Sequence, residues 1–132
     1  MKYLDLFAGY GGFSLGVMEY GECIGFSEVD KYAIQIYESH FNHKNYGDIT
    51  KINPAELADF DLLCGGFPCQ AFSIAGKRGG FEDTRGTLIY DVFRIIKQKY
   101  PKFILLENVK GLLSHDNGRT FKTIITSLAE LG

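Results

Sequence analysis

The chain has 132 residues, enough for one domain with a single sizeable core, and its composition of 45% hydrophobic and 23% charged residues is that of a globular protein. No window approaches 18 uninterrupted apolar residues, and the N-terminus MKYLDLFAG makes a poor signal peptide, so neither a membrane span nor a secretory leader is expected. The formal net charge of −2 by itself says nothing for nucleic acid.

Strand-like and helix-like segments alternate along the chain. Gly21 ends the first helical pattern, Asp30 has the residue type of a helix N-cap, and NPAE over 53–56 begins a short capped helix. In chain order the expected elements are a strand over 2–7, a helix over 12–20, a strand over 23–28, a helix over 31–41, a strand edge that ends at Asp48, a short helix from 53, a strand over 61–66, a helix over 87–99, a strand over 102–107 and a helix over 118–131.

The expected strands are apolar, and KFILLE over 102–107 is typical of a strand buried on both faces. Alternation of such strands with helices predicts an α/β fold: a doubly wound, mostly parallel sheet of about five strands with helices on both sides. In a sheet of this kind ligands gather at the carboxyl ends of the strands. The residues that follow each strand are therefore the candidates for a functional site.

The stretch DLFAGYGG, residues 5–12, joins the first strand to the first helix. Its glycines let the backbone approach a ligand, and the helix start offers free N–H groups. Glu28 ends the next strand, where an acid can bind both hydroxyls of a ribose, and Asp48 is placed to meet an adenine amino group. These residues predict an adenosine-containing cofactor, with a merely structural tight turn as the alternative. Because the spacing is not GxGxxG, S-adenosylmethionine is favoured over a dinucleotide.

The run GFPCQAFSIAG, residues 66–76, places Cys69 just past a strand and among turn residues. A thiolate is a strong soft nucleophile, and nearby cations or helix N-termini lower the pKa of a cysteine. This position favours a nucleophile over the small buried hydrophobe that most free cysteines are, whereas Cys23 and Cys64 lie within strands and are expected to be buried. An odd number of cysteines without CxxC spacing predicts neither a disulfide framework nor a metal site, and fits a reducing cytoplasm.

Glu107, in the run ENV, ends the strand over 102–107. A carboxyl behind an apolar run is expected to be partly desolvated, so that it can hold or donate a proton. A helix cap or a plain surface acid is the alternative. The nucleophile, this acid and the two cofactor acids all map to one edge of one sheet, which favours a shared site.

The segment over 66–86 is rich in glycine, which predicts a long irregular loop. Loops of this length in a compact chain are usually binding loops or lids, with a disordered segment as the alternative. The region around its end is basic, since residues 74–102 carry 7 basic and 3 acidic side chains, whereas residues 1–73 carry 4 and 10. This distribution is typical either of a solvated helix face or of a surface that faces phosphates.

DLFAGYGGFSLG, GFPCQAFSIAG and LLENVKGLL together resemble, in order and spacing, the C5-cytosine DNA methyltransferases. GKRGGFEDTRGTL and SHDNGRT resemble the small bacterial modification enzymes of that family, and the resemblance runs through essentially the whole chain. It implies a Rossmann-like fold that binds S-adenosylmethionine, and methyl transfer to C5 of a cytosine flipped out of duplex DNA. It also implies a cytoplasmic enzyme of bacterial or phage origin, in the setting of a restriction-modification system.

The resemblance implies a role for each residue that matches a family motif. Cys69 would add to C6 of the cytosine, and Pro68 would shape its approach. Glu107 would bind the flipped base at N3 and N4, with Asn108 and Val109 supporting it. The positions implied for S-adenosylmethionine are Phe7, Ala8, Gly9, Gly11, Gly12, Phe13, Glu28, Val29, Asp48, Ile49, Phe67 and Leu88. Those implied for DNA are Gln70, Ser73, Lys77, Arg78 and Arg85.

Members of the family continue with an arginine-bearing motif, a target-recognition domain and a last helix, and nothing in this sequence resembles those parts. We therefore expect residues 1–132 to be the cofactor-binding and catalytic part of a methyltransferase domain, without sequence-specific activity unless a C-terminal half or second subunit completes it. Three alternatives remain. The first is a non-catalytic partner subunit. The second is a tRNA cytosine-5 methyltransferase, but the sequence around the nucleophile of that branch resembles PCQPFTR, whereas this chain has PCQAFSI. The third is a dinucleotide-dependent oxidoreductase, which would leave the PCQ and ENV motifs unexplained.

Overall fold

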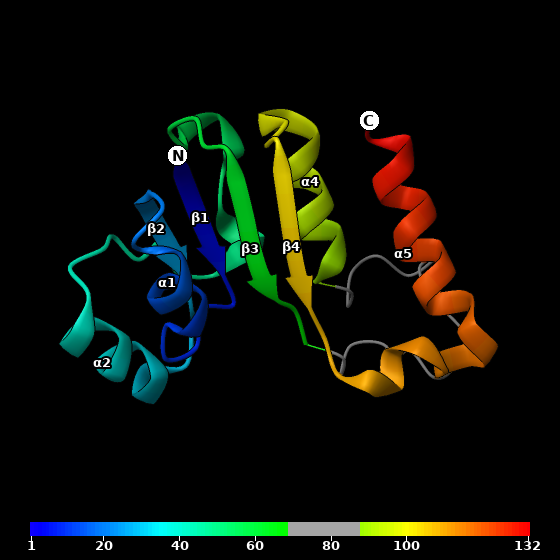
Figure 1. The fold of residues 1–132 in the computed structure, drawn as a ribbon, viewed down its shortest axis with the longest axis horizontal. Coiled ribbons are helices and arrows are strands. Elements are labelled where there is room, and N and C mark those ends of the chain that lie inside the picture. Colours follow the sequence, from blue (N-terminus) through cyan, green and yellow to red (C-terminus); the bar gives the residue numbers. More distant parts are fainter. Residues whose placement is uncertain (69–87) are drawn as a thin grey trace.

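The computed structural model describes residues 1–68 and 88–132, and Figure 1 shows one sheet flanked by helices. The strands are β1 (Lys2–Leu6), β2 (Glu22–Ser27), β3 (Leu62–Gly66) and β4 (Phe103–Glu107). The helices are α1 (Gly12–Val17), α2 (Lys31–His40), α4 (Ile89–Lys99) and α5 (Arg119–Glu130). Short 3-10 turns are η1 (Ile49–Lys51), η2 (Pro54–Glu56), η6 (Lys110–Leu113) and η7 (His115–Gly118).

The strands lie in the order β2-β1-β3-β4, and every pair is parallel. The chain passes from β1 to β2 on one side and then returns to the other side of β1 with β3. The direction of winding therefore reverses between β1 and β3, which is where an open α/β sheet forms a crevice for ligands. The predicted doubly wound parallel α/β fold is confirmed.

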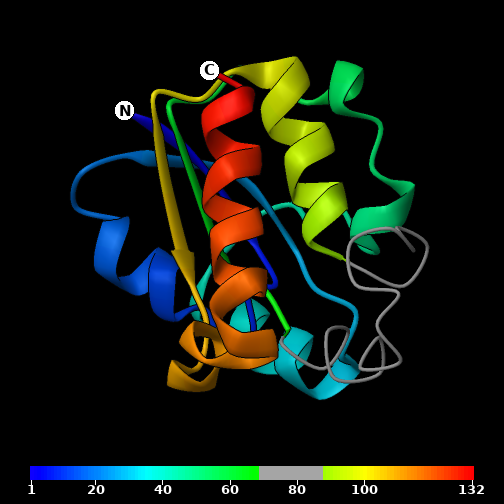
Figure 2. The ribbon, with the colours of Figure 1, turned by 90° about the vertical axis from the view of Figure 1, so that its right-hand side faces the viewer.

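Different helices cover the two faces of the sheet. Leu4 and Leu6 of β1 belong to the main core, which residues of α4 and α5 close. Tyr3, Leu62 and Cys64 form a smaller cluster on the opposite face, against the apolar side of α1. Figure 2 shows α4 and α5 on one side of the strands and α1 on the other. Side chains that alternate along β1 are thus divided between two apolar layers.

The prediction that the strand over 102–107 is buried on both faces is wrong. β4 forms one edge of the described sheet, and Phe103, Ile104 and Leu105 are 60%, 38% and 47% exposed. The parallel register pairs Phe103 and Leu105 with residues of the α1-side cluster, but α1 reaches no further than β3. An apolar sequence therefore occupies a position that the described residues leave open to water.

The strand edge expected before Asp48 is also wrong, because the structure reduces it to one bridge between Phe26 and Asn45. Gly47, with a φ of 78°, turns the chain out of the extended conformation, and Asp48 then caps η1. The described sheet consequently has four strands instead of about five.

Most helix signals are confirmed. Asp30 accepts hydrogen bonds from the N–H groups of Tyr32 and Ala33 at 2.8 and 3.2 Å, as an N-cap should. The first helix ends at Val17, three residues early, because a tighter turn follows in which the N–H of Tyr20 donates to the carbonyl of Val17. The expected start of the helix over 87–99 falls on a residue outside the described range. In the part of the chain that the structure describes, no helix has both the length and the hydropathy needed to span a membrane.

Candidate functional site

Two adjoining pockets lie at the carboxyl ends of the strands. The first, here called the acidic pocket, has a volume of about 480 Å³ and is lined by Phe7, Ser27, Glu28, Val29, Asp30, Asp48, Ile49, Gly66, Pro68 and Leu88. The second, the Glu107 pocket, has a volume of about 410 Å³ and is lined by Phe7, Ala8, Gly12, Phe13, Gly66 and Glu107. Phe7 and Gly66 line both pockets, so a ligand in one lies next to a ligand in the other.

The glycine segment after β1 follows a left-handed path into these pockets. Phe7, Gly9 and Gly11 have φ angles of 50°, 58° and 98°. At Gly11 a Cβ atom would lie 2.7 Å from the ring of Phe41, so only glycine fits there. The path brings the N–H of Gly9 to 2.8 Å from Oε1 of Glu28, which links the end of β1 to the end of β2.

Three backbone N–H groups fix the carboxylate of Glu28. Oε1 accepts from Gly9, and Oε2 accepts from Val29 at 2.8 Å and Asp30 at 3.0 Å. A carboxylate offers about four acceptor positions, so roughly one remains for a ligand donor. The side chain is therefore oriented in advance, at the place where the sequence predicts a contact with ribose.

Asp48 lines the acidic pocket from the segment just before η1. Its Oδ1 accepts from the hydroxyl of Thr50 at 2.8 Å and from the Thr50 N–H at 2.9 Å, and these bonds lower the pKa of Asp48. Its Oδ2 takes no hydrogen bond from residues 1–68 or 88–132. One oxygen thus holds the turn, while the described residues leave the other available to a ligand.

Two polar residues that the sequence analysis missed attach this segment to β2. The side-chain amide of Asn45 donates to the carbonyl of Glu28 at 3.2 Å and accepts from the Glu28 N–H at 3.3 Å and the Gly47 N–H at 2.8 Å. The hydroxyl of Ser27, itself a lining residue, donates to the carbonyl of Gly47 at 2.7 Å. These bonds hold the segment before Asp48 against β2 in place of the expected strand pairing. No local sequence signal predicts them.

The electrostatics of the acidic pocket restrict its ligand. Its described lining contains the acids Glu28, Asp30 and Asp48 and no basic residue. The negative carboxylates of this lining repel the negative charge of a phosphate and attract a positive charge. The lining therefore disfavours a phosphate-bearing ligand and favours a cation. The remaining lining is largely apolar, which suits the faces of a heterocyclic ring.

Glu107 projects from the end of β4 into the second pocket. A Cβ atom on Gly66 would lie 2.9 Å from Oε2 of Glu107, so the glycine leaves space for this carboxylate. The carboxylate takes no hydrogen bond within the described part of the chain. The expected partial desolvation is not found there, because β4 is an edge strand and Glu107 is exposed.

Asn108 joins the ends of two strands. Its side-chain N–H donates to the carbonyl of Phe67 at 2.8 Å, and its Oδ1 accepts from the N–H of Val109 at 2.8 Å. The chain just before Pro68 is therefore held close to Glu107. Val109 itself is 62% exposed, whereas Phe67, expected at the cofactor, is buried in the main core and lines neither pocket.

The structure brings together most of the positions expected at the cofactor. Gly9 and Gly11 shape the loop without lining either pocket, and the others apart from Phe67 line one pocket or both. Outside the described residues lie Cys69 and the positions expected at DNA, namely Gln70, Ser73, Lys77, Arg78 and Arg85.

The burial expected for the two cysteines within strands is confirmed for Cys64 and only partial for Cys23. Cys64 is fully buried, and burial raises its pKa to about 12. Cys23 is half-buried, and burial raises its pKa as well. Neither forms a thiolate readily at neutral pH. No group of three or more potential metal ligands occurs within residues 1–68 and 88–132.

A buried polar network joins β1 to α1 and α2 next to the glycine segment. The hydroxyl of Ser14 donates to Oδ2 of Asp5 at 2.9 Å and lies 2.8 Å from the hydroxyl of Tyr37, which in turn lies 2.8 Å from Nδ1 of His43. Asp5 is fully buried, and its Oδ1 has no partner among the described residues. Burial raises the pKa of Asp5 to about 7 and lowers that of His43.

The Asp5 carboxyl should make the stability of the chain depend on pH. The folded state holds the Asp5 proton up to about pH 7, whereas the unfolded state releases it near the ordinary pKa of 3.8. The free energy of unfolding should therefore fall as pH rises from about 4 to 7, by roughly 4 kcal/mol. Asp5→Asn should remove this fall, as urea unfolding across that range would measure. An equal pH dependence in both proteins would show that Asp5 is not the group responsible.

The sequence matches a known protein family along its whole length. The family model described as C-5 cytosine-specific DNA methylase matches residues 1–132. Type II methyltransferase M.HhaI of Haemophilus parahaemolyticus is 51% identical over 132 residues, which cover 99% of this chain and 40% of that protein. Type II methyltransferase M1.ScrFI of Lactococcus lactis subsp. cremoris is 56% identical, over 98% of this chain and 34% of that protein. The chain thus spans well under half the length of either relative.

A solved structure supports the fold assignment. A protein described as a DNA modification methyltransferase encoded within an E. coli prophage matches with a TM-score of 0.76 and 25% sequence identity. The match covers 98% of this chain and 38% of that one. The two chains therefore share the doubly wound sheet and its helices along almost the whole of the shorter chain.

Proposed function

Because the chain belongs to the C-5 cytosine-specific DNA methylase family, we propose that it is the cofactor-binding and nucleophile-bearing part of an enzyme that methylates C5 of cytosine in duplex DNA, with S-adenosylmethionine as methyl donor. The observation that carries this proposal is the acidic pocket, with three acids, no base and apolar walls among its described lining. S-adenosylmethionine has an adenine ring with apolar faces, ribose hydroxyl donors and a positive sulfonium. Each of these matches part of the lining.

Three kinds of lining residue would hold this ligand. Glu28 would accept a hydrogen bond from a ribose hydroxyl, Oδ2 of Asp48 would accept one from the adenine amino group, and the apolar side chains would flank the ring. When bound, S-adenosylmethionine supplies an electrophilic methyl group beside the Glu107 pocket. A dinucleotide would instead place its pyrophosphate against the same acids, which counts against the oxidoreductase alternative.

In this proposal Cys69 is the nucleophile that attacks the cytosine, and Glu107 is the acid that stabilises the attacked ring. The Sγ atom of Cys69 bonds to C6, and the ring electrons move so that C5 becomes nucleophilic. Glu107 shares a proton with N3 and so offsets the negative charge that develops on the ring. Methylation of C5 would break the bond between the methyl group and the sulfonium sulfur, which would leave as the thioether S-adenosylhomocysteine. A base such as water would then take the C5 proton, so that the C5–C6 double bond re-forms and Cys69 leaves as a thiolate. The base must leave the duplex stack for these contacts, at a cost of a few kcal/mol.

We also propose that a C-terminal half or a second subunit completes the sheet. Phe103 and Leu105 of β4 are exposed on the face that α1 leaves open, and Phe121 and Ile125 of α5 are 39% and 49% exposed. Within residues 1–68 and 88–132 no strand pairs with the outer edge of β4, and apolar side chains at such an edge favour association with another chain.

A methyl-transfer assay tests the proposed function. We expect no site-specific product from the 132-residue chain alone, and product on duplex DNA when the C-terminal part of a relative is supplied in trans. Transfer to tRNA instead of DNA would establish the tRNA methyltransferase alternative. Site-specific product from the chain alone would refute the need for completion. A chain that binds cofactor but yields no product with any complement would be a non-catalytic subunit.

A further inference from the structure

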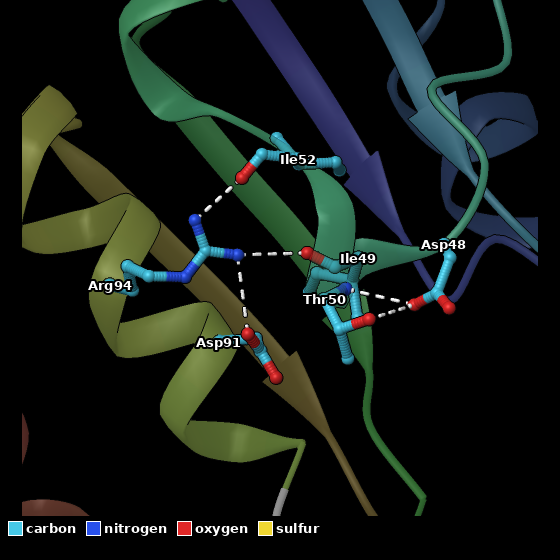
Figure 3. Close-up of polar contacts among 6 residues, drawn as sticks. All are labelled: Asp48, Ile49, Thr50, Ile52, Asp91 and Arg94. Carbon is cyan, nitrogen blue, oxygen red and sulfur yellow. Dashed lines mark hydrogen bonds and ion pairs between the residues drawn. The ribbon is translucent and has the colours of Figure 1, made fainter.

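Arg94 lies on α4, outside the residues that line the acidic pocket, yet it is bonded to one wall of that pocket. Its Nη1 donates to the carbonyl of Ile52 at 2.6 Å, and its Nη2 donates to the carbonyl of Ile49 at 2.9 Å. Nη2 also contacts Oδ1 of Asp91 at 3.2 Å, one turn earlier on the helix. Figure 3 shows this fork between α4 and the chain around η1.

The backbone that Arg94 holds forms the Asp48–Ile49 wall of the pocket. The turn η1 begins at Ile49, and Asp48 caps its first residues through Thr50. Arg94 binds the carbonyl of Ile52, the residue that follows the turn, and the carbonyl of Ile49, which also accepts the turn's own hydrogen bond from the N–H of Ile52. Side chains therefore bind both ends of the turn. The guanidinium of Arg94 ties the turn to α4 through hydrogen bonds, beside the packing of Ile49 and Ile52 in the main core.

We propose that Arg94 is a positioning residue for the cofactor, because it fixes the Asp48–Ile49 wall of the acidic pocket relative to α4. The inference rests on the proposed function, in which Asp48 receives the adenine amino group. Leu88, which precedes α4, lines the pocket about 9 Å from Arg94 along the helix axis. Arg94 thus joins two parts of the lining that are far apart in the sequence.

The chemistry of the contact calls for arginine. A guanidinium presents several donors in a rigid plane, so it can reach two carbonyls and a carboxylate at once. An ammonium group is a compact point charge on a flexible stem. Arg94→Lys should consequently keep one carbonyl bond and hold the wall less firmly, whereas Arg94→Met keeps much of the stem and removes every donor.

Lys99 provides a matched control on the same helix. Its Nζ donates to the carbonyl of Leu57 at 2.8 Å and pairs with Asp59 at 2.7 Å. It therefore also ties α4 to the backbone of the preceding segment. Leu57 and Asp59, however, line neither of the two pockets. Lys99→Met should disturb the packing of α4 as Arg94→Met does, without moving the Asp48–Ile49 wall.

The test measures binding of S-adenosylhomocysteine, and of its inosine counterpart without the adenine amino group, by calorimetry on the wild-type chain and on the R94M, R94K and K99M variants. R94M should weaken binding of S-adenosylhomocysteine about tenfold, and should reduce the preference for it over the inosine compound, while K99M leaves both unchanged. The affinity of R94K for S-adenosylhomocysteine should lie between those of R94M and wild type. If R94M does not fold, R94K is compared with K99M in its place.

Two results would overturn the inference, and they can be told apart. Equal losses in R94M and K99M, in a wild-type chain that binds S-adenosylhomocysteine, would show that Arg94 serves general stability alone. A folded wild-type chain that binds neither compound would overturn the proposed function together with the role of Arg94. Thermal unfolding of each variant, measured on the same samples, separates loss of folded protein from loss of affinity.

Discussion

Replacing Cys69 with serine is expected to abolish methyl transfer to duplex DNA by the completed enzyme. A serine hydroxyl is far less acidic than a thiol, and its oxygen is a harder and weaker nucleophile toward C6. Loss of a covalent nucleophile typically lowers turnover by roughly a thousandfold or more, because the remaining groups act only through the bond that it forms. Cofactor binding should persist, since it depends on the acidic pocket.

Cys23→Ser is the matched control for this experiment. The Cys23 thiol donates to the carbonyl of Gly25 at 3.2 Å, and a serine hydroxyl can keep that bond. Transfer of a radiolabelled methyl group to duplex DNA should therefore persist in Cys23→Ser and vanish in Cys69→Ser. Turnover in Cys69→Ser within tenfold of wild type would contradict the assignment of Cys69 as nucleophile.

Glu28→Gln is expected to weaken binding of S-adenosylmethionine roughly 100-fold. The three N–H groups of Gly9, Val29 and Asp30 all donate to this carboxylate. A glutamine amide has one oxygen, so its NH2 group must face at least one of these donors. Bonds to a charged acceptor are each worth about 1.5–3 kcal/mol, and the change also removes the negative charge beside the bound cation.

Titration calorimetry with S-adenosylmethionine measures this effect, and Glu38→Gln is a suitable control. Glu38 is an exposed acid on α2 and lines neither of the two pockets, so its replacement removes the same charge without touching the site. Equal affinity in Glu28→Gln and wild type would mean that the carboxylate only ties loops together. The ligand would then have to sit elsewhere.

Local chemistry explains what could be predicted from the sequence. The cap at Asp30 and the strands around Leu4 and Leu63 depend on residues close together in the chain, and the structure contains them at nearly the expected positions. Because all strands are parallel, Glu28 and Glu107 both lie at the carboxyl ends of the strands, as the pattern of strands and helices predicts.

Long-range contacts explain what could not be predicted. Asn45 reaches the backbone of Glu28, and Arg94 reaches carbonyls 42 and 45 residues earlier. Such bonds leave no periodic or local signature in the sequence. The exposure of Phe103 has a different cause. The apolar composition of the strand indicates that it can be buried, but it does not indicate whether another element among the described residues covers it.

The most direct test of the central claim is the mass of a covalent complex on DNA. Duplex DNA with 5-fluorocytosine at the target is incubated with the completed enzyme and S-adenosylmethionine, because fluorine at C5 prevents the proton loss that releases Cys69. We predict an adduct of enzyme, DNA and one methyl group, with the bond mapped to the peptide that contains Cys69. An adduct at another residue, or none while ordinary cytosine is methylated, would contradict the account.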